Sequence, residues 1–336
     1  MEENQIIETK KLLQHSKKIV IIPHRNPDGD AMGSTLALYH FLSKLKHQPI
    51  IISPNEFPDF LAWLPGSSDV LIFEKDKHQA TNLLEKADLI LTLDFNALHR
   101  TGEMENVLTK VESPFIMIDH HQAPDDYAQV TFSETRYGST CEMIYDFILA
   151  IANADSIDKT IATCIYTGIV TDSGSFKFPK TTGKTHRIVA DLIDRGVDNT
   201  EVHNLLYNNN TFESLQLLGS ALKNMHILKE HKTSYITLTQ EELDRFNHKK
   251  GDTEGIVNYG LSIKDVIFTA IFIENKDEGI IKISLRSLGN FDVNEFAREY
   301  WNGGGHVNAA GGKSLLSMSE TITRFENIVK NHPKLK

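Results

Sequence analysis

Residues 18–190 alternate between short, continuous apolar runs and longer stretches with helical periodicity. Uninterrupted apolar runs are typical of strands that are buried on both faces of a parallel sheet. They occur at residues 18–23, 49–53, 69–73, 88–94 and 114–119. The helical stretches occupy residues 31–47, 138–152 and 158–170. This alternation predicts an α/β fold with an open, mostly parallel sheet flanked by helices.

The pattern changes after residue 195. Residues 196–230 keep a helical periodicity that the polar sequence YNNNT interrupts, which predicts a helical connector. Farther along, strand-like segments at 233–239, 265–274 and 279–287 alternate with helical segments around 252–260, 292–300 and 318–331. We therefore predict a first domain at residues 1–195, the connector at 196–230 and a smaller α/β domain at 231–336.

The composition narrows the classes of function. The 336 residues carry a formal net charge of -10, which argues against a protein that coats long duplex nucleic acid. The charged N-terminal residues and the lack of an apolar run of about 20 residues predict a cytoplasmic protein without a signal peptide or a membrane span. Cys141 and Cys164 lie in apolar helical segments without a Cys-x-x-Cys spacing, so we predict buried thiols.

Side chains that can bind metals follow four apolar segments of the first domain. They are His24, Asp28 and Asp30 after the first segment, Asp94 after the second, Asp119, His120 and His121 after the third, and Asp172 after the fourth. The carboxyl ends of parallel strands meet at one edge of an open sheet, so we expect these side chains to converge there. Each segment alone could be a turn, a helix cap or an exposed histidine pair. Four such segments in one domain favour a shared site.

The charges of this predicted site indicate its chemistry. Four carboxylates in one crevice, from Asp28, Asp30, Asp94 and Asp172, would repel one another and raise one another's pKa. Two divalent cations would cancel their formal charge. Carboxylate and imidazole donors without thiolates favour Mn²⁺, with Mg²⁺, Co²⁺ or Fe²⁺ as alternatives, over a structural zinc. A pair of cations about 4 Å apart activates water and binds the oxygens of a phosphoryl group, which points to phosphoester hydrolysis.

The second domain and one loop of the first carry candidate residues for binding an anion. They are the consecutive glycines Gly303, Gly304 and Gly305, the neighbouring His306, and the basic residues Arg286 and Arg100. Consecutive glycines let backbone N–H groups approach a phosphate closely, although they could equally form a tight turn. Arginine and histidine side chains are suitable partners for a phosphate or a base.

These motifs resemble those of a known family. The sequence HRNPDGDAMGS at 24–34, the strand-final Asp94, DHH at 119–121 and GIVTDSGSF at 168–176 are similar to the ordered motifs of the DHH phosphoesterase superfamily. NGGGHVNAAGG at 302–312 resembles the glycine-rich signature of the DHH-associated C-terminal domain. The chain is most similar to the branch of nanoRNases, which are bifunctional oligoribonuclease and pAp phosphatase enzymes. Family II inorganic pyrophosphatases share the N-terminal motifs but lack the glycine-rich C-terminal sequence, so this chain differs from them.

The resemblance implies a role for each motif residue. His24 and Asp28 would bind one cation, Asp30, His120 and Asp172 would bind the other, and Asp94 would bridge the two. A hydroxide held between the cations would be the nucleophile. Asp119 would orient an imidazole, and His121 would stabilise the scissile phosphate or protonate the leaving oxygen. Gly29 is expected to let the backbone turn so that Asp28 and Asp30 reach different cations.

The resemblance also implies a substrate class. It points to a Mn²⁺-dependent phosphoesterase that degrades very short RNA to mononucleotides and dephosphorylates 3′-phosphoadenosine 5′-phosphate (pAp), with a homodimer expected at the family level. Two alternatives stay open, a phosphodiesterase acting on pApA or c-di-AMP and a non-catalytic nucleotide-binding sensor. A non-catalytic sensor would be expected to lack at least one of the metal-binding residues. Every expected metal-binding residue is present in the sequence. The sequence does not decide among the substrates, between RNA and DNA, or the polarity of cleavage.

Overall fold

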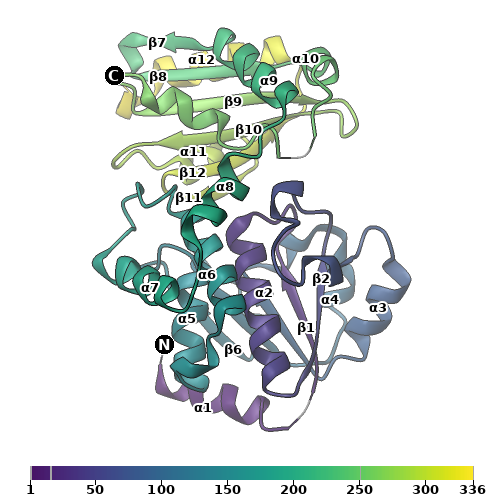
Figure 1. Ribbon diagram of the computed structural model, residues 1–336. Coiled ribbons are helices and arrows are strands. Elements are labelled where there is room, and N and C mark those ends of the chain that lie inside the picture. The colour runs from purple at the N-terminus through teal and green to yellow at the C-terminus, as the bar shows by residue number, and fades with distance from the viewer. Residues whose placement is uncertain (1, 16, 250, 336) are drawn as a thin grey trace. The chain divides into compact units, whose positions relative to one another are not determined.

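The computed structural model describes residues 2–15, 17–249 and 251–335. It consists of two compact units, residues 1–209 and residues 210–336, which are described separately (Figure 1). The division falls within the predicted connector. Helix α8 (Asn199–Tyr207) belongs to the first unit and α9 (Phe212–Lys223) to the second, and the polar residues 208–211 separate them.

The first unit is built on a six-stranded sheet in which all paired strands are parallel. The strands are β1 (Lys18–Pro23), β2 (Gln48–Ser53), β3 (Leu71–Ile72), β4 (Leu89–Leu93), β5 (Phe115–Asp119) and β6 (Val130–Ser133). Their spatial order is β3-β2-β1-β4-β5-β6, so the order along the sheet reverses between β1 and β4. Open α/β sheets bind their ligands outside the carboxyl ends of the strands at such a reversal.

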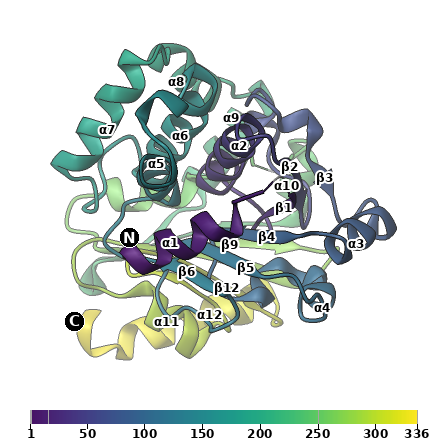
Figure 2. The ribbon, with the colours of Figure 1, turned by 90° about the horizontal axis from the view of Figure 1, so that it is seen from below.

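Helices cover both faces of this sheet. They are α1 (Glu3–Leu12), α2 (Gly29–Lys44), α3 (Lys77–Glu85), α4 (Glu105–Leu108), α5 (Thr140–Ile151), α6 (Lys159–Asp172) and α7 (Gly183–Asp194). Helices α2, α5 and α6 pack together over Ile19 and Ile21 of β1, whereas α3 and α4 lie over Val20 and Ile22 on the opposite face (Figure 2). Because successive strand residues point to opposite faces and both faces are covered, the strand sequences are continuously apolar. The predicted fold class is confirmed.

The second unit contains a smaller, mixed sheet of order β11-β12-β10-β9-β8-β7. The strands are β7 (His226–Leu228), β8 (Thr233–Leu238), β9 (Phe268–Asn275), β10 (Ile280–Ser287), β11 (Gly304–His306) and β12 (Ala309–Ser314). In this sheet the described residues of β8 and β9 pair in parallel, and the other pairings are antiparallel. Helices α11 (Val293–Tyr300) and α12 (Met318–Asn331) cover one face, and α9 with α10 (Gln240–Arg245) covers β8 and β9 on the other.

Some predicted elements differ from the structure. The helix predicted around 252–260 is wrong: turns precede a short 3₁₀ helix, Ile256–Ser262, because Gly251 and Gly255 adopt φ values of 105° and 77° that are incompatible with an α-helix. The structure also contains strands β6, β7, β11 and β12, which the apolar pattern of the sequence does not predict. Glycine-rich β11 and β12 contain few of the β-branched residues typical of strands. Among the described helices, none has the length and apolar character needed to cross a bilayer.

Candidate metal centre

The four ligand-bearing segments meet at the carboxyl edge of the first sheet. Strand β1 leads into His24, β4 into Asp94 and β5 into the Asp119–His121 segment, and α6 ends at Asp172. Six of their side chains form two groups, and within each group the ligand atoms lie within 4.8 Å of one another; Asp94, Asp119 and His121 form a further group of this kind. The first group is His24, Asp28 and Asp94, and the second is Asp30, His120 and Asp172. The structure thus brings all six predicted metal ligands together.

Asp94 lies between the two groups. Its Oδ2 atom is 3.5 Å from Nε2 of His24, and its Oδ1 atom is 3.4 Å from Nε2 of His120. The backbone of Asp94 has a φ of 63°, a left-handed conformation that costs energy in a residue other than glycine. The turn directly after β4 therefore directs one carboxylate oxygen toward each group.

Asp28 and Asp30 stand at the start of α2 and face different groups. Asp28 caps the helix, because its Oδ1 atom accepts hydrogen bonds from the N–H groups of Asp30 and Ala31, both at 3.0 Å. Its Oδ2 atom lies 3.9 Å from Nε2 of His24. Oδ2 of Asp30 lies 3.8 Å from Nε2 of His120. The expected separation of these two carboxylates is present, and the helix cap produces it.

Gly29 has a different role from the expected one. Its φ is not positive, and the residue of this loop with a left-handed backbone is Asn26, with a φ of 58°. A Cβ atom at Gly29 would lie only 2.4 Å from Oγ1 of Thr171. The expectation of a sharp turn at Gly29 is therefore wrong. The glycine instead lets α2 approach α6 closely beside Asp172.

Backbone carbonyl groups fix the orientation of two imidazoles. Nδ1–H of His24 donates a hydrogen bond to the carbonyl oxygen of Arg25 at 2.9 Å, and Nδ1–H of His120 donates to that of Tyr137 at 3.3 Å. In both rings Nε2 faces the carboxylates. Histidines that bind metals commonly donate their second ring N–H in this way, which fixes the tautomer and the ring position.

His121 is held by Asp119 from two sides. Asp119 is fully buried at the end of β5, where its Oδ1 atom accepts a 2.6 Å hydrogen bond from Nδ1–H of His121. Its Oδ2 atom accepts a 2.9 Å hydrogen bond from the backbone N–H of the same histidine. Because the buried carboxylate accepts hydrogen bonds from both the backbone N–H and the ring N–H of His121, the imidazole has little rotational freedom. This is the arrangement expected of an orienting residue.

Burial and mutual repulsion perturb the acid–base properties of the cluster. Burial, with the charges of Asp94 and Asp172, raises the pKa of Asp30 well above its usual range. Burial also raises the pKa of Asp172 to about 6. For His120, burial lowers the pKa, but the hydrogen bond with Asp94 and the charges of three carboxylates outweigh it and raise the pKa to about 10. These residues fit two divalent cations, which would replace the protons and stabilise the carboxylates in their charged form.

Binding of Mn²⁺ is expected to release protons at pH 7. His120, with a pKa of about 10, carries a proton that a metal-bound imidazole must lose. The bound state therefore holds fewer protons, and a rise in pH favours binding, by up to about tenfold per pH unit for each proton released. Calorimetric titration in two buffers of different ionisation enthalpy counts these protons. A count of zero at pH 7 would contradict the assignment of His120 as a ligand.

The N-terminus of α5 makes contacts with the cluster that the sequence analysis missed. The backbone N–H of Thr140 donates to Oδ2 of Asp30 at 2.6 Å, and its hydroxyl donates to Oδ1 of Asp94 at 2.9 Å. The N–H of Cys141 donates to Oδ1 of Asp30 at 2.9 Å. The serine before an apolar helical stretch is a signal for a helix start, and Ser139 does cap α5. Nothing in the local sequence connects that helix start to Asp30 or Asp94.

Arg100 borders the first ligand group. It lies in the 3₁₀ segment Leu98–Met104, where its carbonyl oxygen accepts a 2.8 Å hydrogen bond from the N–H of Arg25. Burial lowers the pKa of His24, and the charge of Arg100 lowers it further, but contacts with Asp94 and Asp28 produce a net increase. Arg100 is therefore close enough for its charge to act on the cluster.

The remaining candidate residues lie in the second unit. Arg286 of β10 and His306 of β11 both pair with Ala309 of β12, which places their side chains in one row across the sheet. The glycines permit the close approach of β11 and β12, since a Cβ atom at Gly303 would lie 1.8 Å from the carbonyl oxygen of Gly311. The N–H groups of Gly303 and Gly305 donate within the unit, to Ala297 and Asn294. A phosphate bound at these N–H groups would have to replace these bonds.

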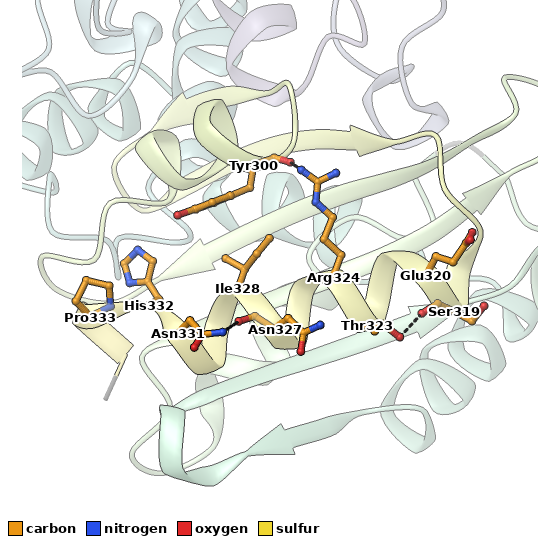
Figure 3. Close-up of a pocket in the computed structure, with 10 residues that line it drawn as sticks. All are labelled: Tyr300, Ser319, Glu320, Thr323, Arg324, Asn327, Ile328, Asn331, His332 and Pro333. Carbon is orange, nitrogen blue, oxygen red and sulfur yellow. Dashed lines mark hydrogen bonds between the residues drawn. The ribbon is translucent and has the colours of Figure 1, made fainter.

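A separate pocket of about 730 Å³ also lies in the second unit (Figure 3). Its lining residues are Tyr300, Ser319, Glu320, Thr323, Arg324, Asn327, Ile328, Asn331, His332 and Pro333. Arg324, its central basic residue, donates a 3.0 Å hydrogen bond to the carbonyl oxygen of Tyr300 and stacks over Trp301. None of the described residues that line this pocket is a predicted site residue.

A parallel sheet that collects hard metal ligands at the reversal of its strand order is an architecture suited to phosphoester hydrolysis. The family model of the DHH family, N-terminal domain, matches residues 18–169, and that of the DHHA1 domain matches residues 233–331. The chain belongs to the DHH family, and the prediction of a phosphoesterase is confirmed.

Three relatives place the chain within this family. A crystal structure of an exopolyphosphatase-related protein from Bacteroides fragilis is 40% identical, with a TM-score of 0.94, and the match covers 98% of this chain and 97% of that one. The bifunctional oligoribonuclease and PAP phosphatase NrnA of Bacillus subtilis is 27% identical over 94% of this chain and 95% of its own. The cyclic-di-AMP phosphodiesterase GdpP of the same organism is 23% identical over 96% of this chain and 49% of its own.

Proposed function

We propose that this protein is a phosphoesterase dependent on two divalent cations, with Mn²⁺ preferred, that degrades very short RNA to mononucleotides and dephosphorylates pAp. The observation that carries the proposal is the pair of adjacent ligand groups, with one carboxylate oxygen of Asp94 facing a histidine of each group. His24 and Asp28 would hold one cation, and Asp30, His120 and Asp172 the other, with Asp94 contacting both. When bound, the cations would supply a nucleophilic water at neutral pH and neutralise charge on the reacting phosphate.

The chain's own residues would provide the acid for the leaving group. Asp119 engages Nδ1 of His121, so proton transfer to the substrate would go through Nε2. In both proposed reactions the leaving atom is a ribose oxygen, which is poor as an alkoxide and benefits from protonation. Arg100, whose charge already acts on His24, would add positive charge beside the phosphate.

The similarity to the B. subtilis NrnA protein supports the choice of substrates. That similarity extends through nearly all of both chains, and it therefore includes the second unit as well as the unit that carries the candidate ligands. A short anionic substrate is also compatible with the net charge of -10, because only a local positive field is required.

The second unit offers a row of basic residues for the rest of the substrate. We propose that Arg286 and His306 bind a phosphate or a base there. On the same face of β10, Lys282 lies directly opposite Lys313 of β12, and like charges in this position destabilise a sheet. A bound anion would relieve that repulsion. Lys282 lies four strand residues from Arg286, a separation of about 13 Å along β10.

Replacing Arg286 by glutamine is expected to raise KM for pAp and for a dinucleotide about 10- to 100-fold, with a smaller effect on kcat. This corresponds to the loss of one hydrogen-bonded charge, worth about 1.5–3 kcal/mol. Steady-state kinetics measure both constants. Arg245→Gln, on the exposed surface of α10, is the matched control and should behave as the wild type. An unchanged KM in Arg286→Gln would remove Arg286 from the substrate site.

The proposed function is tested by product profiles. The purified protein is incubated with pAp, pApA, c-di-AMP and a ladder of short RNAs, with Mn²⁺, with Mg²⁺ and with excess chelator. We expect AMP from pAp and mononucleotides from the shortest RNAs, with the highest rates in Mn²⁺ and negligible turnover in chelator. Sustained turnover in chelator would rule out the cation-dependent mechanism.

A second candidate function is hydrolysis of pApA or c-di-AMP. The match to GdpP favours it, although the chain spans about half of that relative's length. The same substrate panel distinguishes the two functions, since a dinucleotide phosphodiesterase would prefer pApA or c-di-AMP over pAp by a large ratio of kcat/KM.

A further inference from the structure

We infer that Thr140 is a positioning residue that fixes the carboxylate of Asp94 in its shared position and thereby sets the affinity of the centre for cations. The inference rests on the proposed function, because it presupposes that Asp94 contacts two cations. It concerns a residue outside the predicted ligand set, at the first position of α5.

The geometry at Asp94 is the first part of the argument. Its Oδ2 atom faces His24 and its Oδ1 atom faces His120, so rotation of the carboxylate would remove an oxygen from one or both groups. The hydroxyl of Thr140 donates a 2.9 Å hydrogen bond to Oδ1. Both side chains are buried, Thr140 completely, so water cannot easily substitute for this bond.

The same residue also contacts the second carboxylate. The N–H groups of Thr140 and Cys141 donate to Oδ2 and Oδ1 of Asp30, so that each oxygen of Asp30 accepts one bond from the start of α5. These two donors at the start of the helix hold both oxygens of this carboxylate in place. Thr140 therefore contacts both Asp30 and Asp94. Its bond to Asp94 comes from the side-chain hydroxyl, which a substitution can remove, whereas its bond to Asp30 comes from the backbone.

A purely structural role would look different. Two other buried threonines in the helices of the first unit bond to their own helix: the hydroxyl of Thr35 donates to the carbonyl oxygen of Ala31, and that of Thr167 donates to that of Thr163. The first residue of a helix has no carbonyl of its own helix four positions earlier. The hydroxyl of Thr140 instead donates to a carboxylate 46 positions away in the sequence.

The test is a titration of the full chain with Mn²⁺ alone, by calorimetry and by electron paramagnetic resonance. Thr140→Val removes the hydroxyl at nearly constant volume, Thr140→Ser retains it, and Thr35→Val is the control for the same change at an equally buried site. We expect Thr140→Val to weaken Mn²⁺ binding about 10- to 100-fold, the usual effect of losing a residue that orients a metal ligand. Thr140→Ser and Thr35→Val should remain within about threefold of the wild type, which is less than 1 kcal/mol.

Three results would decide the matter. Weak binding in Thr140→Val with recovery in Thr140→Ser supports the inference, provided that circular dichroism shows both variants folded. Wild-type affinity in folded Thr140→Val, or equal losses in the valine and serine variants, overturns the role of the hydroxyl while leaving the proposed function intact. A wild-type protein that takes up no Mn²⁺ overturns the proposed function and this inference with it.

Discussion

Replacing Asp94 by asparagine is expected to lower kcat/KM for pAp and for a dinucleotide by about 10³-fold or more. The two oxygens of Asp94 face the two ligand groups, and an amide would offer only one neutral oxygen in their place. Both cations would then bind weakly, and their repulsion would be uncompensated. A metal pair contributes several kcal/mol to phosphoryl transfer, and about 4 kcal/mol corresponds to 10³-fold in rate.

Initial rates at saturating Mn²⁺ measure this effect. Asp59→Asn is the matched control, because Asp59 is exposed in a short 3₁₀ segment of the same unit and should leave the rates unchanged. Because Asp94→Asn removes a buried charge among other charges, its thermal unfolding must be compared with that of the wild type. A folded Asp94→Asn protein with rates within tenfold of the wild type would contradict the shared role of Asp94.

Replacing His121 by glutamine is expected to reduce kcat by about 10²- to 10⁴-fold, the usual contribution of general acid catalysis. Mn²⁺ binding should change little, because in the proposed arrangement His121 acts on the substrate, and its ring is held by Asp119. A large loss of kcat with unchanged Mn²⁺ binding would distinguish the role of His121 from that of the six proposed metal ligands. His78→Gln, an exposed histidine on α3, serves as the control.

The leaving group gives a sharper test of this role. A nucleoside p-nitrophenyl phosphate releases a stable phenolate that needs no proton from an acid. We expect the deficit of His121→Gln to shrink by at least about tenfold with this substrate relative to pAp. An equal deficit with both substrates would indicate that His121 stabilises the phosphate by charge and does not protonate the leaving oxygen.

Much of the fold follows from local sequence because the first sheet is covered on both faces. Val20 and Ile22 face α3 and α4 while Ile19 and Ile21 face the other layer, and this produces continuous apolar runs that are easy to recognise. Strand β6 lacks such a run, since its residues alternate between buried and half-buried positions. The glycine-rich β11 and β12 depend on their pairing with each other and with β10, which local propensity does not contain.

The sequence predicts those parts of the candidate site that follow from the order and direction of the strands. Parallel strands place their carboxyl ends at one edge, so the ligands after β1, β4 and β5 had to lie near one another. The requirement for a glycine at position 29 could not be predicted in the same way, because it arises from the close packing of Thr171, which lies in another helix. Nor could the contact of Thr140 with Asp30, which joins residues 110 positions apart.

The central claim is that two cations share Asp94, and anomalous X-ray diffraction at the manganese absorption edge tests it most directly. Crystals grown with Mn²⁺ should show two manganese peaks about 4 Å apart. Asp94 should contact both ions, with Asp28 on one and Asp30 on the other. A single peak, or two peaks with Asp28 and Asp30 bound to the same ion, would contradict the account.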